Sequence, residues 1–121
     1  MKLFSLKRKK QDPDFAFQID DVFALKVDGV VVTGKVTSGI LRCGDQVLCI
    51  PKDGNSFSCV IEGIEQPNPM RQGQYVHPSE ARANGPCNGH YALRILGRDK
   101  SDFHPGDQLF PITYTPPQNN F

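Results

Sequence analysis

The sequence predicts an all-β fold, namely a small barrel of six strands with one long irregular loop. Three observations favour it. Residues 30–36 are rich in Val and Thr, whose branched Cβ atoms suit a pleated strand better than a helix. Glycines at positions 29, 34, 39 and 44 supply turns or bulges between apolar runs. Apolar and polar residues alternate in several short runs, which is typical of half-buried strands.

Length and charge indicate one modest domain. The chain has 121 residues and a net charge of +1 at pH 7, so as a whole it is not a polyanion binder. We expect a flexible basic lead over residues 1–14, the barrel over 15–114 and a tail over 115–121. The sequence lacks the long apolar run of a transmembrane helix and the apolar core of a signal peptide. These features predict a cytoplasmic protein that makes no membrane contact.

The first two strands are expected to form a hairpin. Apolar residues at positions 15, 17 and 19 alternate with polar or small ones, and the alternation resumes at positions 23, 25 and 27. Asp28-Gly29 is a tight-turn signal that leads into the second strand, residues 30–36. Gly34 lies inside that strand, and we expect it at a bulge with positive φ.

A second hairpin is expected from residues 46–50 and 57–65, joined by a polar turn around Gly54. With the turn centred there, Cys49 and Cys59 would lie opposite each other, close enough to form a bond. In the absence of a signal peptide, four reduced cysteines are the simpler interpretation, and a redox or metal role for this pair is the alternative.

Gly44-Asp45 and Gly106-Asp107 repeat one structural device. In each, a Gly turn is followed by an Asp whose side chain can accept hydrogen bonds from backbone N–H groups of the turn, and a strand then begins. We interpret the two copies as the same solution at two corners of the barrel.

The segment 66–89 is the expected long loop. Its prolines and its many Gly, Asn and Gln residues exclude a regular structure throughout. Residues 79–83 are predicted to form one helical turn with Ser79 as N-cap. Two more strands, 90–96 and 108–114, complete the barrel. Long ordered loops on small barrels tend to carry function, so this loop is the most interesting segment.

No catalytic residue is predicted. The stretch Gly29–Lys35 resembles a phosphate-binding loop, but Val36 stands where the Ser or Thr for Mg²⁺ should be, and no helical pattern follows. Asp20 and Asp21 are neighbours on a strand and point to opposite faces, so they cannot act as a carboxylate pair. No G-x-S-x-G sequence occurs.

No metal or other cofactor is predicted either. The cysteines form no C-x-x-C pair. Cys87, His90 and His77 could meet around the long loop, but a zinc site needs three or four ligands at close range. We therefore expect these residues to serve no metal.

Several runs, taken in order, resemble the second domain of elongation factor Tu, the β-barrel shared by translational GTPases. The matching runs are Ile19–Phe23, Val30–Val36, Ser38–Leu41, Gly44–Val47, Ile61–Glu65, Leu93–Gly97 and Asp102–Leu109. The resemblance covers about residues 15–112. It implies a closed Greek-key barrel of the translation-protein type.

The resemblance also implies where a ligand would bind. In that family the barrel follows a GTPase domain and helps to hold the acceptor end of transfer RNA, or touches ribosomal RNA. The sequence holds no GTPase domain, so GTP binding is not expected. Glu65 ends the strand where the family places residues near the terminal adenosine. The family's turn before the fifth strand appears as Ala83-Asn-Gly85-Pro, stretched by the long loop.

Two hypotheses of function follow. The first is a binding module that recognises a partner protein through the long loop and the barrel edge. The second is an RNA-binding module, whose affinity would fall steeply with salt. The candidate binding residues are Glu65, Arg71, Tyr75, His77 and Arg82. Under the second hypothesis Arg94 and a basic arm join them, the arm being Lys7, Arg8, Lys9 and Lys10.

Overall fold

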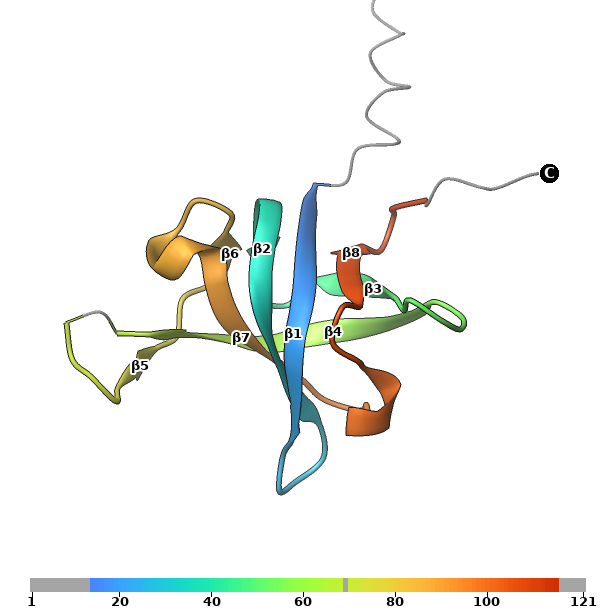
Figure 1. Ribbon diagram of the computed structural model, residues 1–121, viewed down its shortest axis with the longest axis horizontal. Coiled ribbons are helices and arrows are strands. Elements are labelled where there is room, and N and C mark those ends of the chain that lie inside the picture. The colour runs from blue at the N-terminus through green and yellow to red at the C-terminus, as the bar shows by residue number, and fades with distance from the viewer. Residues whose placement is uncertain (1–13, 69, 116–121) are drawn as a thin grey trace, which may run out of the picture.

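The computed structural model describes residues 14–68 and 70–115 and shows a closed antiparallel barrel (Figure 1). The strands run β1 (Phe15–Ala24), β2 (Val30–Arg42), β3 (Gln46–Ile50), β4 (Phe57–Pro67), β5 (Tyr75–Val76), β6 (Glu80–Arg82), β7 (His90–Ile95) and β8 (Gln108–Pro111). Two short 3₁₀ turns, η1 (Pro86–Gly89) and η2 (Lys100–Asp102), precede β7 and β8. None of the described helices is long and apolar enough to cross a membrane.

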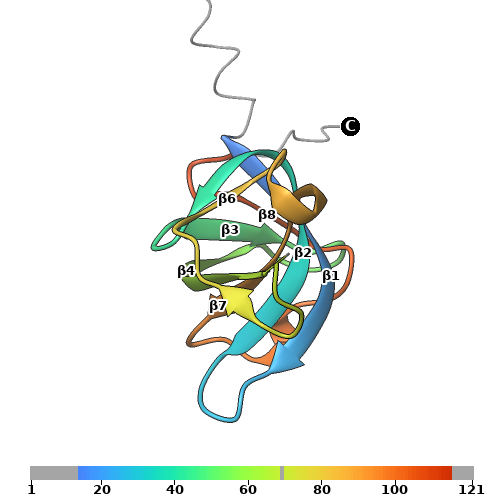
Figure 2. The same ribbon diagram turned by 90° about the vertical axis from the view of Figure 1, so that its left-hand side faces the viewer.

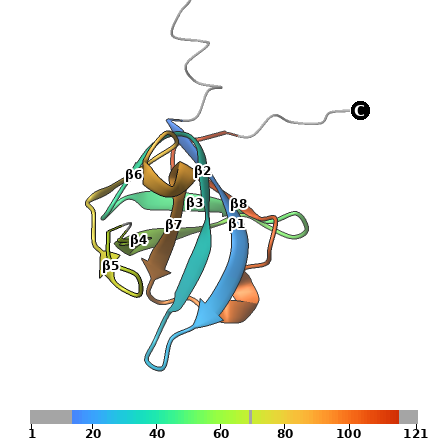
Figure 3. The same ribbon diagram turned by 60° about the vertical axis from the view of Figure 1, so that its left-hand side comes forward.

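Six strands close the barrel. They pair in the order β1-β8-β3-β4-β7-β2, and the pairing of β1 with β2 completes the ring. Figures 2 and 3 show the six strands winding around a common centre, and β5 and β6 are not part of this ring. The predicted fold class, an all-β six-stranded barrel, is confirmed. The predicted long loop contains β5, β6 and η1, so it is less irregular than expected.

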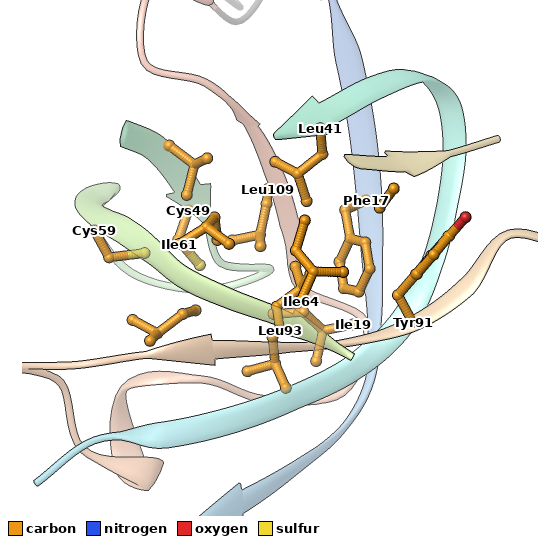
Figure 4. Close-up of a cluster of buried hydrophobic side chains, with 14 of the residues drawn as sticks. Phe17, Ile19, Leu41, Cys49, Cys59, Ile61, Ile64, Tyr91, Leu93 and Leu109 are labelled. Carbon is orange, nitrogen blue, oxygen red and sulfur yellow. The ribbon is translucent and has the colours of Figure 1, made fainter. Parts of the chain in front are cut away.

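The core fills the barrel interior with side chains from every barrel strand (Figure 4). The largest fully buried side chains are Phe17, Ile19, Leu41, Ile61, Ile64, Leu93, Ile95 and Leu109. Full burial of a Leu, Ile or Phe side chain stabilises the fold by about 1.5–3 kcal/mol. Among the described residues, the core cluster includes none between Ile64 and Ala81, so residues 65–68 and 70–80 add nothing to it.

The Asp side chains of the two Gly-Asp turns accept backbone hydrogen bonds, as predicted. Asp45 Oδ2 accepts a hydrogen bond from Arg42 N at 2.8 Å, which caps the turn before β3. Asp107 Oδ2 accepts one from His104 N at 2.9 Å, and its Oδ1 accepts one from Lys52 N at 3.1 Å. Asp107 is buried, and these bonds satisfy its carboxylate.

The alternation predicted for positions 23, 25 and 27 is wrong. The register between β1 and β2 shifts between Ile19 and Asp21, where β1 carries an extra residue. An extra residue moves all following side chains to the opposite face. Val22 is therefore buried and Phe23 is 50% exposed, and β1 ends at Ala24.

The conformation predicted for Gly34 is also wrong. Gly34 is not among the glycines with positive φ. Glycine is required for space instead, because a Cβ there would collide with the backbone oxygen of Gln18 and lie 2.8 Å from the Phe17 ring. The run Gly29–Lys35 that resembles a phosphate-binding loop leads into β2 and forms its first half.

Cys49 and Cys59 do not lie opposite each other as predicted. The β3–β4 register pairs Cys49 with Phe57 and Val47 with Cys59, because the hairpin turns about a point nearer Asp53 than Gly54. Both cysteines are free and buried. Burial raises the pKa of the Cys49 thiol to about 12 and that of Cys59 to about 11.

The helical turn predicted for residues 79–83 is wrong as well, since β6 lies there and pairs with the end of β2. Cys43 N donates to Ser79 O at 2.9 Å, and Ala83 N donates to Gly39 O at 3.2 Å. Pairing with β2 and burial of Ala81 override a weak local helix signal.

Candidate functional site

The outstanding feature of the surface is a hairpin formed by residues 66–76, which we call the arm. It consists of the end of β4, a turn and β5, and it projects from the barrel at the left of Figure 1. Gln66 pairs with Val76 and Pro67 with Tyr75. Asn68 N donates to Gln74 O at 2.8 Å, and the Asn68 side chain accepts a bond from Met70 N at 2.9 Å. These bonds order the turn locally.

Large apolar side chains of the arm lie in solvent. Met70 is 86% exposed, Tyr75 is 59% exposed and Val76 is 39% exposed. Arg71, also exposed, lies in the turn beside Met70. The arm therefore combines apolar area with one guanidinium, on a hairpin whose strand β5 pairs, among the described strands, with β4 alone.

The base of the arm holds two more of the candidate residues. Glu65 lies on β4 opposite Ala92 of β7, and His77 follows β5 directly. His77 Nδ1 lies 3.9 Å from Glu65 Oε2, and both side chains are in contact with solvent. The structure thus brings Glu65, Tyr75 and His77 together along one hairpin, with Arg71 at its tip.

Arg82 lies apart from this group, on β6. It binds Glu80 Oε1, while Arg42 Nε binds Glu80 Oε2 at 3.2 Å. The hydrogen bond from Arg82, with the charge of both guanidiniums, holds the pKa of the Glu80 carboxyl below its usual range. Arg82 therefore helps to hold the Glu80 carboxylate that Arg42 of β2 also binds, and the structure does not join Arg82 to the arm.

A second surface, on the outer face of β1, β2, β7 and β4, was missed by the sequence analysis. Phe23 pairs with Val31 and Val31 pairs with Arg94, whose Nε lies 3.3 Å from Glu62 Oε1. Exposed Leu96 lies at the end of the same face. The extra residue in β1 turns Phe23 outward. In the sequence, the sign of this extra residue was the doublet Asp20-Asp21 inside an apolar strand.

The structure also has a shallow open depression of about 480 Å³ between β1 and η2. Phe103 and Val22 line its floor, and Lys100 and His104 lie on its rim. Nothing in this depression combines buried polar groups with an enclosed cavity, which small-molecule sites require.

The three residues considered for zinc are not clustered. Within residues 14–68 and 70–115, no group of three or more His, Cys, Asp or Glu side chains could hold a metal ion. His90 Nδ1 lies 3.0 Å from the backbone oxygen of Cys87, not from its sulfur. The candidate basic arm, Lys7 to Lys10, lies outside the described residues, so its role stays a prediction.

Comparison with known proteins bears on the fold of this chain. No family model matches the chain. Among solved structures, it is similar to translation elongation factor SelB from Methanococcus maripaludis in the apo form, with 22% identity, a TM-score of 0.62 and coverage of 84% of this chain and 20% of that chain. The same factor in complex with the GTP analogue GppNHp gives 24% identity and a TM-score of 0.63, with the same coverage.

These similarities establish the architecture. The barrel is of the type formed by the second domain of elongation factor Tu, as the sequence runs indicated. The chain spans about a fifth of the length of the solved elongation factors that it matches, since it covers 20% of each.

Proposed function

We propose that this chain is a non-catalytic binding module that recognises a partner protein through the arm and the adjoining barrel edge. The observation that carries the proposal is the exposed apolar area of the arm, with Met70 at 86% and Tyr75 at 59% exposure on a projecting hairpin. Exposed apolar side chains gathered on one projecting element are typical of an interaction site.

The barrel does not need the arm for its core. The buried cluster draws on every barrel strand and on Ala81, and on none of the residues that the structure describes between Ile64 and Ala81. A long ordered segment that adds nothing to a core and costs conformational entropy to order is typical of a binding element.

The side chains of the arm suit a protein interface. Tyr, Met and Arg are enriched at the centres of interfaces, because they combine large contact area with a polar or polarizable group. Tyr75, Met70 and Arg71 supply these three types within one hairpin. Glu65 and His77, at its base, would form part of the polar rim.

RNA binding is the alternative function, because the matched structures are translation elongation factors. Two of the arginines assigned to an RNA-binding flank are already paired, Arg82 with Glu80 and Arg94 with Glu62. At each of these exposed pairs a phosphate would compete with a carboxylate of this chain, which modestly favours a protein partner.

The test is affinity purification of the tagged chain from its own cells, with and without ribonuclease. The double variant Met70→Ser, Tyr75→Ser removes the apolar side chains of the arm. The matched control, Phe23→Ser with Val27→Ser, removes exposed apolar side chains from the end of β1 and the turn that follows it, outside the arm.

Under the proposal, a defined protein stays bound to the tagged chain after ribonuclease treatment. The arm variant recovers at least about tenfold less of this protein, whereas the control variant recovers as much as the unaltered chain. Transfer or ribosomal RNA that co-purifies, with every protein lost on ribonuclease treatment, would support the alternative. Equal recovery by the arm variant and the control would contradict recognition through the arm.

A further inference from the structure

We propose that the free edge of β5 recognises an extended, acidic segment of the partner, which adds to the arm as a further antiparallel strand. This inference rests on the proposed function and specifies how the same site recognises its ligand. Main-chain hydrogen bonds to an exposed sheet edge are a general mode of peptide recognition.

The hydrogen-bond alternation of the arm shows which backbone groups face outward. The bond from Asn68 N to Gln74 O makes residues 68 and 74 a hydrogen-bonded pair. In an antiparallel ladder such pairs alternate with non-bonded ones, so Gln66 and Val76 form the next bonded pair, and Pro67 and Tyr75 a non-bonded pair. Pro67, which has no N–H group, fits that position. The N–H and C=O of Tyr75 and His77 therefore point away from β4.

That edge has no partner strand in the described part of the chain. The strand β5 pairs with β4 alone and lies off the closed path of the barrel. The Tyr75 residue is 59% exposed, and the His77 side chain is 70% exposed. In Figure 3 the strand β5 lies at the outer margin of the molecule.

The other short outer strand, β6, is different. The outward groups of Arg82 are already used, since Arg82 N donates to Tyr91 Oη at 3.3 Å and Arg82 O accepts a bond from Gly85 N at 3.1 Å. The edge of β6 is thus partly occupied within this chain, which leaves the edge of β5 as the more available of the two. Pro78 ends it, which limits addition to a short segment and opposes open-ended aggregation.

The charge of the arm indicates the chemistry of the added strand. Residues 66–79 include the exposed cation Arg71, whereas His77 lies 3.9 Å from Glu65, a carboxylate of this chain. A segment that alternates carboxylates with β-branched apolar residues would place an acceptor near Arg71 and apolar contacts against Tyr75 or Val76. A basic segment would bring like charge to Arg71.

The test uses amide hydrogen exchange of the full chain, followed by NMR, with three synthetic probes. The first is a seven-residue peptide of alternating Glu and Val. The second has Lys in place of Glu, and the third is the Glu peptide with a central Pro. We expect the first peptide to slow exchange of the Tyr75 and His77 amides at least about tenfold, with little effect on the already bonded Val76 amide. The Lys and Pro peptides should not do so.

A matched pair of variants separates backbone from side-chain recognition. Tyr75→Pro removes the outward N–H together with the side chain, whereas Tyr75→Ala removes the side chain alone. Strand addition predicts that Tyr75→Pro weakens binding of the Glu peptide at least about tenfold more than Tyr75→Ala does. Retained protection of the Val76 amide in Tyr75→Pro would show that the arm is still formed.

Two results would overturn strand addition: equal binding by the two variants, or absence of protection at Tyr75 and His77 at millimolar Glu peptide. These results leave the proposed function intact if the partner protein is still lost with the Met70→Ser, Tyr75→Ser variant. If that loss is absent too, both proposals fail.

Discussion

The barrel and the arm of this protein are built in opposite ways. Each barrel strand pairs on both sides and contributes buried side chains, and the ring leaves no open edge within it. The arm has two paired residue positions in β5, exposed apolar side chains and an edge with no partner in the described chain. Stability is therefore concentrated in one region, and the groups suited to recognition in the other.

The largest expected effect is on the barrel, through Gly34. In Gly34→Val the new Cβ would collide with the Gln18 backbone, and β1 and β2 could not approach. We expect the variant to lose more than about 4 kcal/mol and to fail to fold at ambient temperature. Circular dichroism and thermal unfolding would check this, and an unchanged melting temperature would contradict it.

Gly44 provides the control for that result. It has a φ of +93° and no atom within 4 Å of a built Cβ, so Gly44→Ala tests backbone conformation without a collision. We expect a loss of about 1 kcal/mol. A loss as large as that of Gly34→Val would mean that close approach is not what requires glycine at position 34.

The next prediction compares truncation of one large side chain in the barrel with truncation of one on the arm, by the loss of stability. Leu93 is fully buried, and Leu93→Ala should lower the free energy of unfolding by about 2–5 kcal/mol. Tyr75→Ala on the arm should change it by less than about 0.5 kcal/mol. Chemical denaturation of the two variants checks the contrast, which fails if the two losses are similar.

A smaller effect is expected from the buried thiols at high pH. Burial raises the Cys49 pKa from an ordinary 9.0 to about 12, so the folded state favours the neutral thiol. Its contribution is intact below pH 9 and is lost as the pH rises toward 12, with on the order of 1 kcal/mol lost at pH 10. Denaturation at pH 8 and pH 10 should show that Cys49→Ala loses less stability between these pH values than the unaltered protein does. Equal losses would contradict the assignment.

The sequence predicted the barrel because the signals for strands and turns lie in residues that are close together in the chain. Branched residues, glycine turns and alternation predict strands, and β3 has the same bounds as predicted, Gln46–Ile50. The capping roles of Asp45 and Asp107 were also predictable, because each acts on a backbone N–H a few residues away.

Features set by contacts distant in the sequence could not be predicted in this way. The extra residue in β1, which turns Phe23 outward, depends on the register with β2. The strand β6 depends on pairing with residues 40–42, and propensity alone favoured a helical turn there. At the site, Glu65, Tyr75 and His77 could be proposed one by one, but only the pairing of β4 with β5 brings them together.

A small effect on stability is also expected from removal of the whole arm. Replacement of residues 67–75 by Asn-Gly would close Gln66 directly onto Val76, a hydrogen-bonded pair that a two-residue turn can join. Since the core includes none of the described residues of this segment, we expect the free energy of unfolding to change by less than about 1 kcal/mol.

Recovery of the partner protein by this shortened chain, after ribonuclease treatment, tests the central claim most directly. We expect a folded barrel, with a melting temperature close to that of the intact protein, that recovers at least about tenfold less partner. A folded, shortened chain that recovers as much partner as the intact protein would contradict the claim that the arm is the recognition element.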